Sequence, residues 1–241
     1  MTPRQSRLVR ISLVCGIGSS LLYAAMNVFV AAQWDGYSSA SQTVSELSAI
    51  DAPTRPLWVS LAVVYSLLTA AFGWGVWMSG RRQRPLRVVG GLIVATSLIG
   101  LVWPPMHQRE VLAAGGGTLT DTLHIVWTIV TNVLFMLQIG FAAASFGKRF
   151  RLYSVATLVA LVAFGALTGM DAPRMQANLP TPWIGVWERI GIGVFMLWFV
   201  VLATTLLRAF TLNSDNSCEL STPSIATQRV AGRILSLSST R

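Results

Sequence analysis

The sequence predicts an all-α integral membrane protein with six transmembrane helices, and three observations lead to this fold class. Of the 241 residues, 53% are hydrophobic and only 11% are charged, whereas a soluble domain carries about a quarter charged residues. Six apolar stretches reach the length of about 20 residues that crosses a bilayer. Because a chain inside lipid must satisfy its backbone hydrogen bonds internally, each continuous stretch is predicted to be a helix.

The predicted spans cover residues 11–32, 57–79, 86–103, 121–146, 152–170 and 183–207. The first could be a signal peptide cleaved after Ala32, but its apolar core of about 22 residues exceeds the roughly 7–15 of such peptides. The third is the shortest and stops before Pro104, since proline ends a helix. Together the spans form one domain, residues 1–210, and the polar segment 211–241 is predicted to be a disordered cytoplasmic tail.

The orientation in the membrane is predicted from the Lys and Arg residues. Most of the 18 lie in the two terminal segments and two short loops: Arg4, Arg7, Arg10, Arg81, Arg82, Arg84, Arg87, Lys148, Arg149, Arg151, Arg208, Arg229, Arg233 and Arg241. The positive-inside rule therefore puts both termini in the cytoplasm and the protein in the cell (inner) membrane. Nucleic-acid binding is not expected, despite the net charge of +9, because the charges form short clusters between apolar stretches.

Helix 121–146 carries the first candidate site. Its polar residues recur at helical spacing and are predicted to share one face: Asp121, His124, Thr128, Thr131 and Asn132. Lipid does not accommodate such a face, so it should turn toward the bundle interior or a water-filled cavity. The simpler alternative is that Asp121 complements the helix dipole and that His124 bonds a neighbouring carbonyl.

Further ionisable residues occupy the outer loops and the start of the last helix. Thr43-Val-Ser-Glu46 has the spacing of a capping box. It predicts a short helix and gives Glu46 a structural role, while Ser45 is free to face a cavity. The remaining candidates are two pairs near helix exits, His107 with Arg109 and Asp171 with Arg174, and the adjacent residues Glu188 and Arg189.

Glu188 and Arg189 are expected to have partners on other segments. They are adjacent on one helix and therefore do not face each other, and a charge at that depth is costly unless it is paired. Asp121 or Asp171 is the expected partner of Arg189, and His124 or Arg109 that of Glu188. These charges would then form either a binding site or an ion-pair network that only holds the bundle together.

A zinc site is one hypothesis for these side chains. His107, His124 and Asp121 would supply the three protein ligands, with Asp171 or Glu188 as alternative carboxylates. Such a site would activate water and hydrolyse a lipid ester or amide. His124 would act as ligand or base, Asp121 would orient it, and Arg109 would bind an oxyanion or phosphate. No His-x-x-x-His spacing supports this hypothesis, and no other cofactor is expected.

Several short elements resemble a known family. Ser45-Glu46-Leu47-Ser48, Met106-His107-x-Arg109 and Asp121-x-x-His124 resemble, in order and topology, the bacterial multi-pass family catalogued as domain of unknown function 998. The resemblance covers about residues 11–209 and implies a six-helix membrane fold. That family is distantly similar to the Frag1/DRAM/Sfk1 membrane proteins, which implies a role in lipid organisation or regulation. The chain is also similar to the alkaline-ceramidase type of hydrolase, but it has one helix and one His fewer.

Three functions are compatible with these observations. The first is a non-enzymatic membrane protein whose outward-facing polar cavity binds a lipid headgroup or a membrane-protein partner. The second is a metal- or acid/base-dependent hydrolase that acts on lipid. The third is a small proton-coupled transporter, although the inner halves of the helices contain almost no ionisable residues. The sequence favours the first.

Overall fold

The structure is a computed structural model of the chain and describes residues 2–81 and 83–221. Within these ranges the regular elements are all helical. The six long helices are α1 (Pro3–Phe29), α2 (Arg55–Ser79), α3 (Arg84–Gly100), α5 (Leu119–Ala143), α6 (Lys148–Gln176) and α7 (Ile184–Ser221). Three short helices lie between them: η1 (Ala31–Gln33), η2 (Val44–Ser48) and α4 (Arg109–Ala113).

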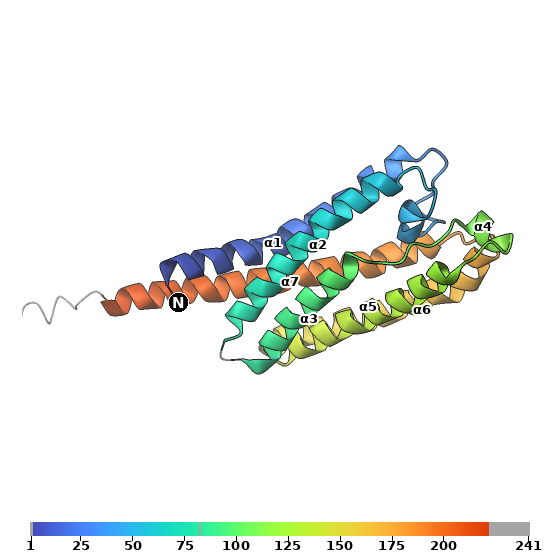
Figure 1. Ribbon diagram of the computed structural model, residues 1–241. Helices are drawn as coiled ribbons and strands as arrows, with labels where there is room; N and C mark the ends of the chain where they lie inside the picture. The colour runs from blue at the N-terminus through green and yellow to red at the C-terminus, as the bar shows by residue number, and fades with distance from the viewer. Residues whose placement is uncertain (1, 82, 222–241) are drawn as a thin grey trace, which may run out of the picture.

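The long helices form an up-and-down bundle in which each packs against its neighbours in the chain. α1 also packs against α7, which closes the ring of helices. Figure 1 shows the start of α1 at the same end of the bundle as the short α2–α3 and α5–α6 turns. The opposite end holds η1, η2, α4 and the three longer connections, and we call it the distal end (Figure 1).

The core lies where α7 meets the other helices. Phe72 of α2 packs edge-on against Phe199 of α7, with ring centroids 5.1 Å apart. Trp198 is completely buried, and its indole N–H donates to Ser154 Oγ of α6 at 3.1 Å. Val9 and Leu13 of α1 are also completely buried in this cluster. The predicted first span is therefore part of the core.

The predicted spans are confirmed as helices, and five helical segments are long and apolar enough to cross a membrane: Pro3–Gln33, Arg55–Ser79, Leu119–Ala143, Lys148–Gln176 and Ile184–Phe210. The predicted third span is not among these five. α3 has 17 residues, or roughly 26 Å at 1.5 Å per residue, against about 30 Å of hydrocarbon. It ends at Gly100 because the following Pro104-Pro105 pair prevents further helical turns.

Two helices run further than the sequence predicts. α6 passes through Pro173, which removes only one hydrogen bond of the last turns, and reaches Gln176. It ends where Asn178 takes a positive φ of 50° and the Leu179 N–H bonds the Arg174 carbonyl at 2.8 Å, an arrangement that commonly terminates helices.

α7 continues to Ser221, into the segment for which the sequence predicts disorder. No Pro or Gly occurs between Gly193 and Pro223 to stop it. The rest of the predicted disordered tail, residues 222–241, lies outside the described residues.

Close packing of α2 against α3 depends on glycine. A Cβ at Gly90 would overlap the Trp77 backbone nitrogen and lie 2.7 Å from the Gly73 carbonyl oxygen. We expect Gly90→Ala to destabilise the protein by about 2 kcal/mol, because backbone atoms must move apart, and to lower the melting temperature in detergent by roughly 4–8 °C. Gly140→Ala is the control, since nothing lies within 4 Å of the added methyl group. Equal melting temperatures would contradict the prediction.

Candidate functional site

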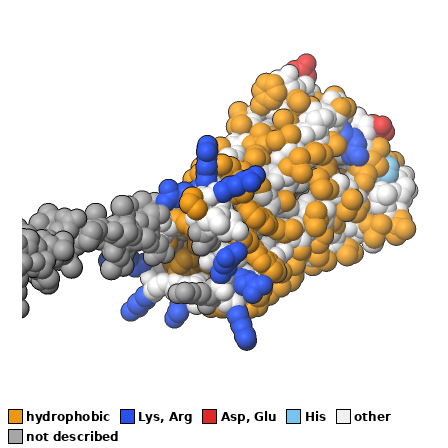
Figure 2. All heavy atoms as spheres, turned by 60° about the vertical axis from the view of Figure 1, so that its left-hand side comes forward, with side chains coloured by type: hydrophobic (Ala, Val, Ile, Leu, Met, Phe, Trp, Pro, Cys, Tyr) orange, Lys and Arg blue, Asp and Glu red, His pale blue; other side chains and the backbone are white. Residues whose placement is uncertain are grey.

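The distal end contains all ten residues that the sequence singles out as site candidates. They come from the α1–α2 connection, the segment between α3 and α5, the start of α5, the end of α6 and the start of α7. Figure 2 shows most of the visible Lys and Arg side chains at the end where the chain begins, and the visible Asp, Glu and His side chains at the opposite end. The structure therefore separates charge along the bundle axis, as the sequence predicts.

A buried ion pair between Arg109 and Glu46 occupies the centre of the distal end. Arg109 Nε and Nη2 donate to the two carboxylate oxygens of Glu46, each at 2.8 Å. The same guanidinium donates to Thr181 Oγ1 at 3.2 Å and to the Ser41 carbonyl at 3.1 Å. Arg109 thus joins three distal segments. Arg109 was one of the two partners expected for Glu188, the other being His124, and the pairing of Arg109 with Glu188 is wrong.

The environment keeps Arg109 charged. Burial by itself would lower the pKa of its guanidinium, but the hydrogen bonds and negative charge of Glu46 outweigh burial and raise the pKa above its ordinary value. Only 2% of the Glu46 side chain is exposed, and its Oε2 also accepts the Thr43 backbone N–H at 2.7 Å. The predicted capping box is confirmed, because Thr43 and Glu46 cap η2 reciprocally.

Arg189 makes a second set of contacts without a carboxylate. Its Nη1 donates to the carbonyls of Ser39 at 2.9 Å, Gln42 at 3.0 Å and Gly185 at 3.1 Å. Its Nη2 donates to the Tyr37 hydroxyl at 2.6 Å. The ion pairs among the described residues are His107–Asp121 and Arg109–Glu46, so the expected pairing of Arg189 with Asp121 or Asp171 is wrong.

Tyr37 connects Arg189 to η2. Its hydroxyl donates to the Thr43 carbonyl at 2.7 Å while it accepts from Arg189. Burial raises the pKa of Tyr37 to about 12, although the nearby Arg189 acts in the opposite direction. The phenol therefore keeps its proton at ordinary pH and remains a donor.

Glu188 is held by the backbone and has none of the expected side-chain partners. Its Oε2 accepts the Val44 N–H at the start of η2. A carboxylate at this position satisfies a helix N–H that has no partner within its own helix. Glu188 and Arg189 therefore both fasten α7 to the α1–α2 connection.

Asp121 contacts His107. The zinc hypothesis required Asp121 to orient His124, and the structure shows no such contact among the described residues. Asp121 Oδ1 accepts the His107 backbone N–H at 2.7 Å, and Oδ2 lies 2.9 Å from His107 Nδ1. Asp121 also completes a capping box with Thr118 at the start of α5. One carboxylate therefore joins two segments through backbone and side-chain donors.

His124 lies between two other segments. Its Nδ1 is 2.7 Å from the Pro104 carbonyl oxygen, and its Nε2 is 3.2 Å from Ser45 Oγ. Only 8% of His124 is exposed. The predicted stripe on α5 is partly inward, because His124 and Thr131 are buried but Thr128 is exposed.

Asp171 and Arg174 are not brought into these contacts. Arg174 is exposed and donates to the Pro180 carbonyl at 3.0 Å. Asp171 makes no hydrogen bond or ion pair with a described residue. In residues 2–81 and 83–221, no group of three or more His, Cys, Asp and Glu residues is placed to hold a metal ion.

Sequence reasoning missed Tyr37 and Thr181. Thr181 precedes α7, which begins at Ile184, and donates to the Ser41 carbonyl at 3.0 Å. Tyr37 is chemically unremarkable in the sequence, and only its position near Arg189 gives it a role. No local pattern identifies either contact.

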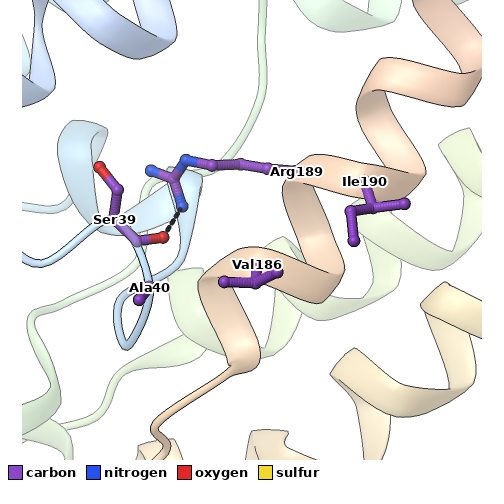
Figure 3. Close-up of a pocket in the computed structure, with 5 residues that line it drawn as sticks. All are labelled: Ser39, Ala40, Val186, Arg189 and Ile190. Carbon is purple, nitrogen blue, oxygen red and sulfur yellow. Dashed lines mark hydrogen bonds between the residues drawn. The ribbon is translucent and has the colours of Figure 1, made fainter.

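Two open grooves meet at Arg189. The first, of about 460 Å³, is lined by Ser39, Ala40, Val186, Arg189 and Ile190. Figure 3 shows the Arg189 side chain crossing from α7 to the Ser39 carbonyl beside this groove. The second, of about 420 Å³, is lined by Asn27, Val28, Ala31, Ala32, Tyr37, Ser39 and Arg189. Both combine one cation with mostly apolar walls, and we call them together the Arg189 groove.

The family model described as protein of unknown function (DUF998) matches residues 17–205, and the chain belongs to this family. No curated protein and no solved structure matches the chain. The matched range contains the whole distal end, so the contacts described above lie inside the family's common region.

Proposed function

We propose that this member of the DUF998 family is a six-span protein of the cell membrane, with both termini in the cytoplasm and the distal end outside. The basic end of the bundle supports this orientation (Figure 2). α3 packs closely against α2 and α5, and we take it as the sixth span. Its short length is compatible with this role because a bilayer thins around short helices at modest cost.

We further propose that the Arg189 groove binds the phosphate of an anionic lipid headgroup. The observation that carries the proposal is that Arg189 forms no ion pair with a carboxylate among the described residues. All four of its hydrogen-bond acceptors are neutral oxygens, and its Nε makes no hydrogen bond with a described residue. Arginine N–H groups bind phosphate strongly, particularly where water is partly excluded.

The walls of the groove match the rest of a lipid molecule. Val28 and Ile190 present exposed apolar surface beside Arg189, and exposed Leu197 lies two turns further along α7. An acyl chain would follow this surface into the bilayer while its phosphate stays at Arg189.

We expect Arg189→Gln to lower the affinity for phosphatidylglycerol roughly 10-fold or more. The physical reason is the loss of charge-assisted hydrogen bonds, each worth about 1.5–3 kcal/mol. The measurement is native mass spectrometry of the purified protein in detergent, titrated with phosphatidylglycerol, with phosphatidylcholine, and with glycerol phosphate, which has no acyl chains. Wild type should prefer phosphatidylglycerol, and the preference should weaken as salt rises.

Arg174→Gln is the matched control. Arg174 also lies at the distal end and donates to a backbone carbonyl, but it lines neither groove. It should bind phosphatidylglycerol like wild type. Equal lipid binding by the Arg189 and Arg174 variants, with both folded, would refute the proposal, and equal binding of glycerol phosphate would assign the site to free phosphate.

A further inference from the structure

The hydrogen bonds of His124 define which of its ring nitrogens carries the proton. The Pro104 carbonyl oxygen, 2.7 Å from Nδ1, can only accept, so Nδ1 carries the hydrogen in the neutral ring. Nε2 then presents a lone pair to Ser45 Oγ at 3.2 Å, and the serine hydroxyl is the donor. Ser45, His124 and the Pro104 carbonyl thus form a directed chain of two hydrogen bonds.

We propose that Ser45 and His124 are the nucleophile and the general base of an acyl-transfer site. This site would cleave carboxylic esters of amphipathic molecules at the outward-facing surface of the cell membrane. A nucleophilic serine requires a base within hydrogen-bond reach and a third group that orients the base. In this site the Pro104 carbonyl takes the orienting position that a carboxylate holds in Ser-His-Asp triads. The inference is independent of lipid binding at Arg189.

The surrounding structure holds this pair in place. Ser45 lies in η2, whose cap is formed by Thr43 and Glu46, and Glu46 is fixed by Arg109. The Pro104-Pro105 segment that carries the orienting carbonyl has little backbone freedom. His124 lies on α5, which is tied to α3 by the bond from Trp127 Nε1 to the Ile99 carbonyl at 3.2 Å. Reacting groups held on such fixed elements need less rearrangement to react.

Access and charge stabilisation are also present. Ser45 is only partly buried, whereas its neighbours Val44 and Glu46 are buried. The Ser45 backbone N–H, at the start of η2, makes no hydrogen bond to a described residue and lies beside its own hydroxyl. It is therefore available to donate to the oxyanion that forms when the ester carbonyl is attacked.

The reaction proceeds in two balanced steps. Ser45 Oγ bonds to the ester carbonyl carbon as His124 Nε2 takes its proton; the carbon–oxygen bond to the alcohol then breaks, and His124 gives that proton to the departing alcohol. This leaves the acyl group on Ser45. Water attacks the acyl carbon, His124 takes one water proton and returns it to Ser45 Oγ, and the carboxylic acid leaves.

The test is labelling of the full-length protein in detergent with a fluorophosphonate probe, followed by peptide mass spectrometry. We expect native wild type to be labelled at Ser45, heat-unfolded wild type and Ser45→Ala to show no label there, and His124→Gln to react roughly 100-fold more slowly, as expected for loss of a general base. The rate of p-nitrophenyl butyrate hydrolysis by the Ser45→Ala and His124→Gln variants should fall in parallel with their labelling.

Ser48→Ala is the control, because Ser48 lies in the same short helix and donates to the Ser45 carbonyl at 3.1 Å, without contacting His124. It should react like wild type. Melting temperatures establish that each variant is folded. Native wild type that is not labelled at Ser45 would overturn the proposal even if the His124 variant fails to fold, and so would a folded His124→Gln protein labelled at the wild-type rate.

Discussion

The Arg109→Ala variant is expected to unfold roughly 10 °C or more below wild type in detergent. Removing one partner of a buried ion pair costs about 3–5 kcal/mol, because the other charge stays buried without compensation, and each kcal/mol corresponds to roughly 2–4 °C for a chain of this size. Here the charge left behind is Glu46, whose side chain is 2% exposed. Loss of Arg109 also removes its hydrogen bonds to Thr181 Oγ1 and to the Ser41 carbonyl.

A double variant separates the ion pair from simple loss of packing. Glu46→Gln combined with Arg109→Met removes both charges and keeps most of the volume, so the double variant should be more stable than Arg109→Ala. Arg174→Ala is the surface control and should melt within about 2 °C of wild type, since exposed substitutions rarely exceed 0.5 kcal/mol. A small effect of Arg109→Ala, similar to that of the control, would disprove a structural role for the pair.

The Gly185→Ala variant is expected to destabilise the distal end by about 2–3 kcal/mol and to weaken phosphatidylglycerol binding. A methyl group at Gly185 would overlap the carbonyl oxygens of Ser39 and Gln42 and would lie 2.9 Å from Arg189 Nη1. Backbone atoms cannot yield as a flexible side chain does, so the connection that Arg189 holds must move. Melting temperature and the lipid titration both report this change.

Gly193→Ala tests the same substitution elsewhere on α7. No atom lies within 4 Å of its added methyl group, and alanine favours a helix by up to about 1 kcal/mol over glycine. This variant should be as stable as wild type or more so, with unchanged lipid binding. Identical behaviour of the two glycine variants would show that the contact at Gly185 is unimportant.

The helices could be predicted from the sequence because their formation depends on local composition. Continuous apolar residues are sufficient to define a helix that crosses lipid, and all the predicted spans are helices in the structure. The errors lie at ends where local signals conflict. The fifth predicted span ends at residue 170, but α6 continues to Gln176, and the positive φ of Asn178 and the bond from Leu179 to Arg174 then terminate it.

The contacts of the candidate site were only partly predictable. The cap of η2 by Glu46 follows from four consecutive residues and is confirmed. Asp121 was expected to orient His124 because the two are one helical turn apart, yet it bonds His107, which reaches it from another segment. The short spacing of two residues on one helix places them on a common face, but it does not determine which residue each side chain contacts.

The sequence by itself determined the helical membrane fold, the separation of charge between the two ends and the gathering of His, Asp, Glu and Arg candidates at one of them. These properties add up residue by residue along the chain. Only the tertiary structure decided that Arg109 pairs with Glu46, across 63 residues, that Arg189 forms no ion pair within the described part of the chain, and that Ser45 meets His124. Such pairings depend on the paths of the connecting loops and on which charges must be neutralised when they are buried together.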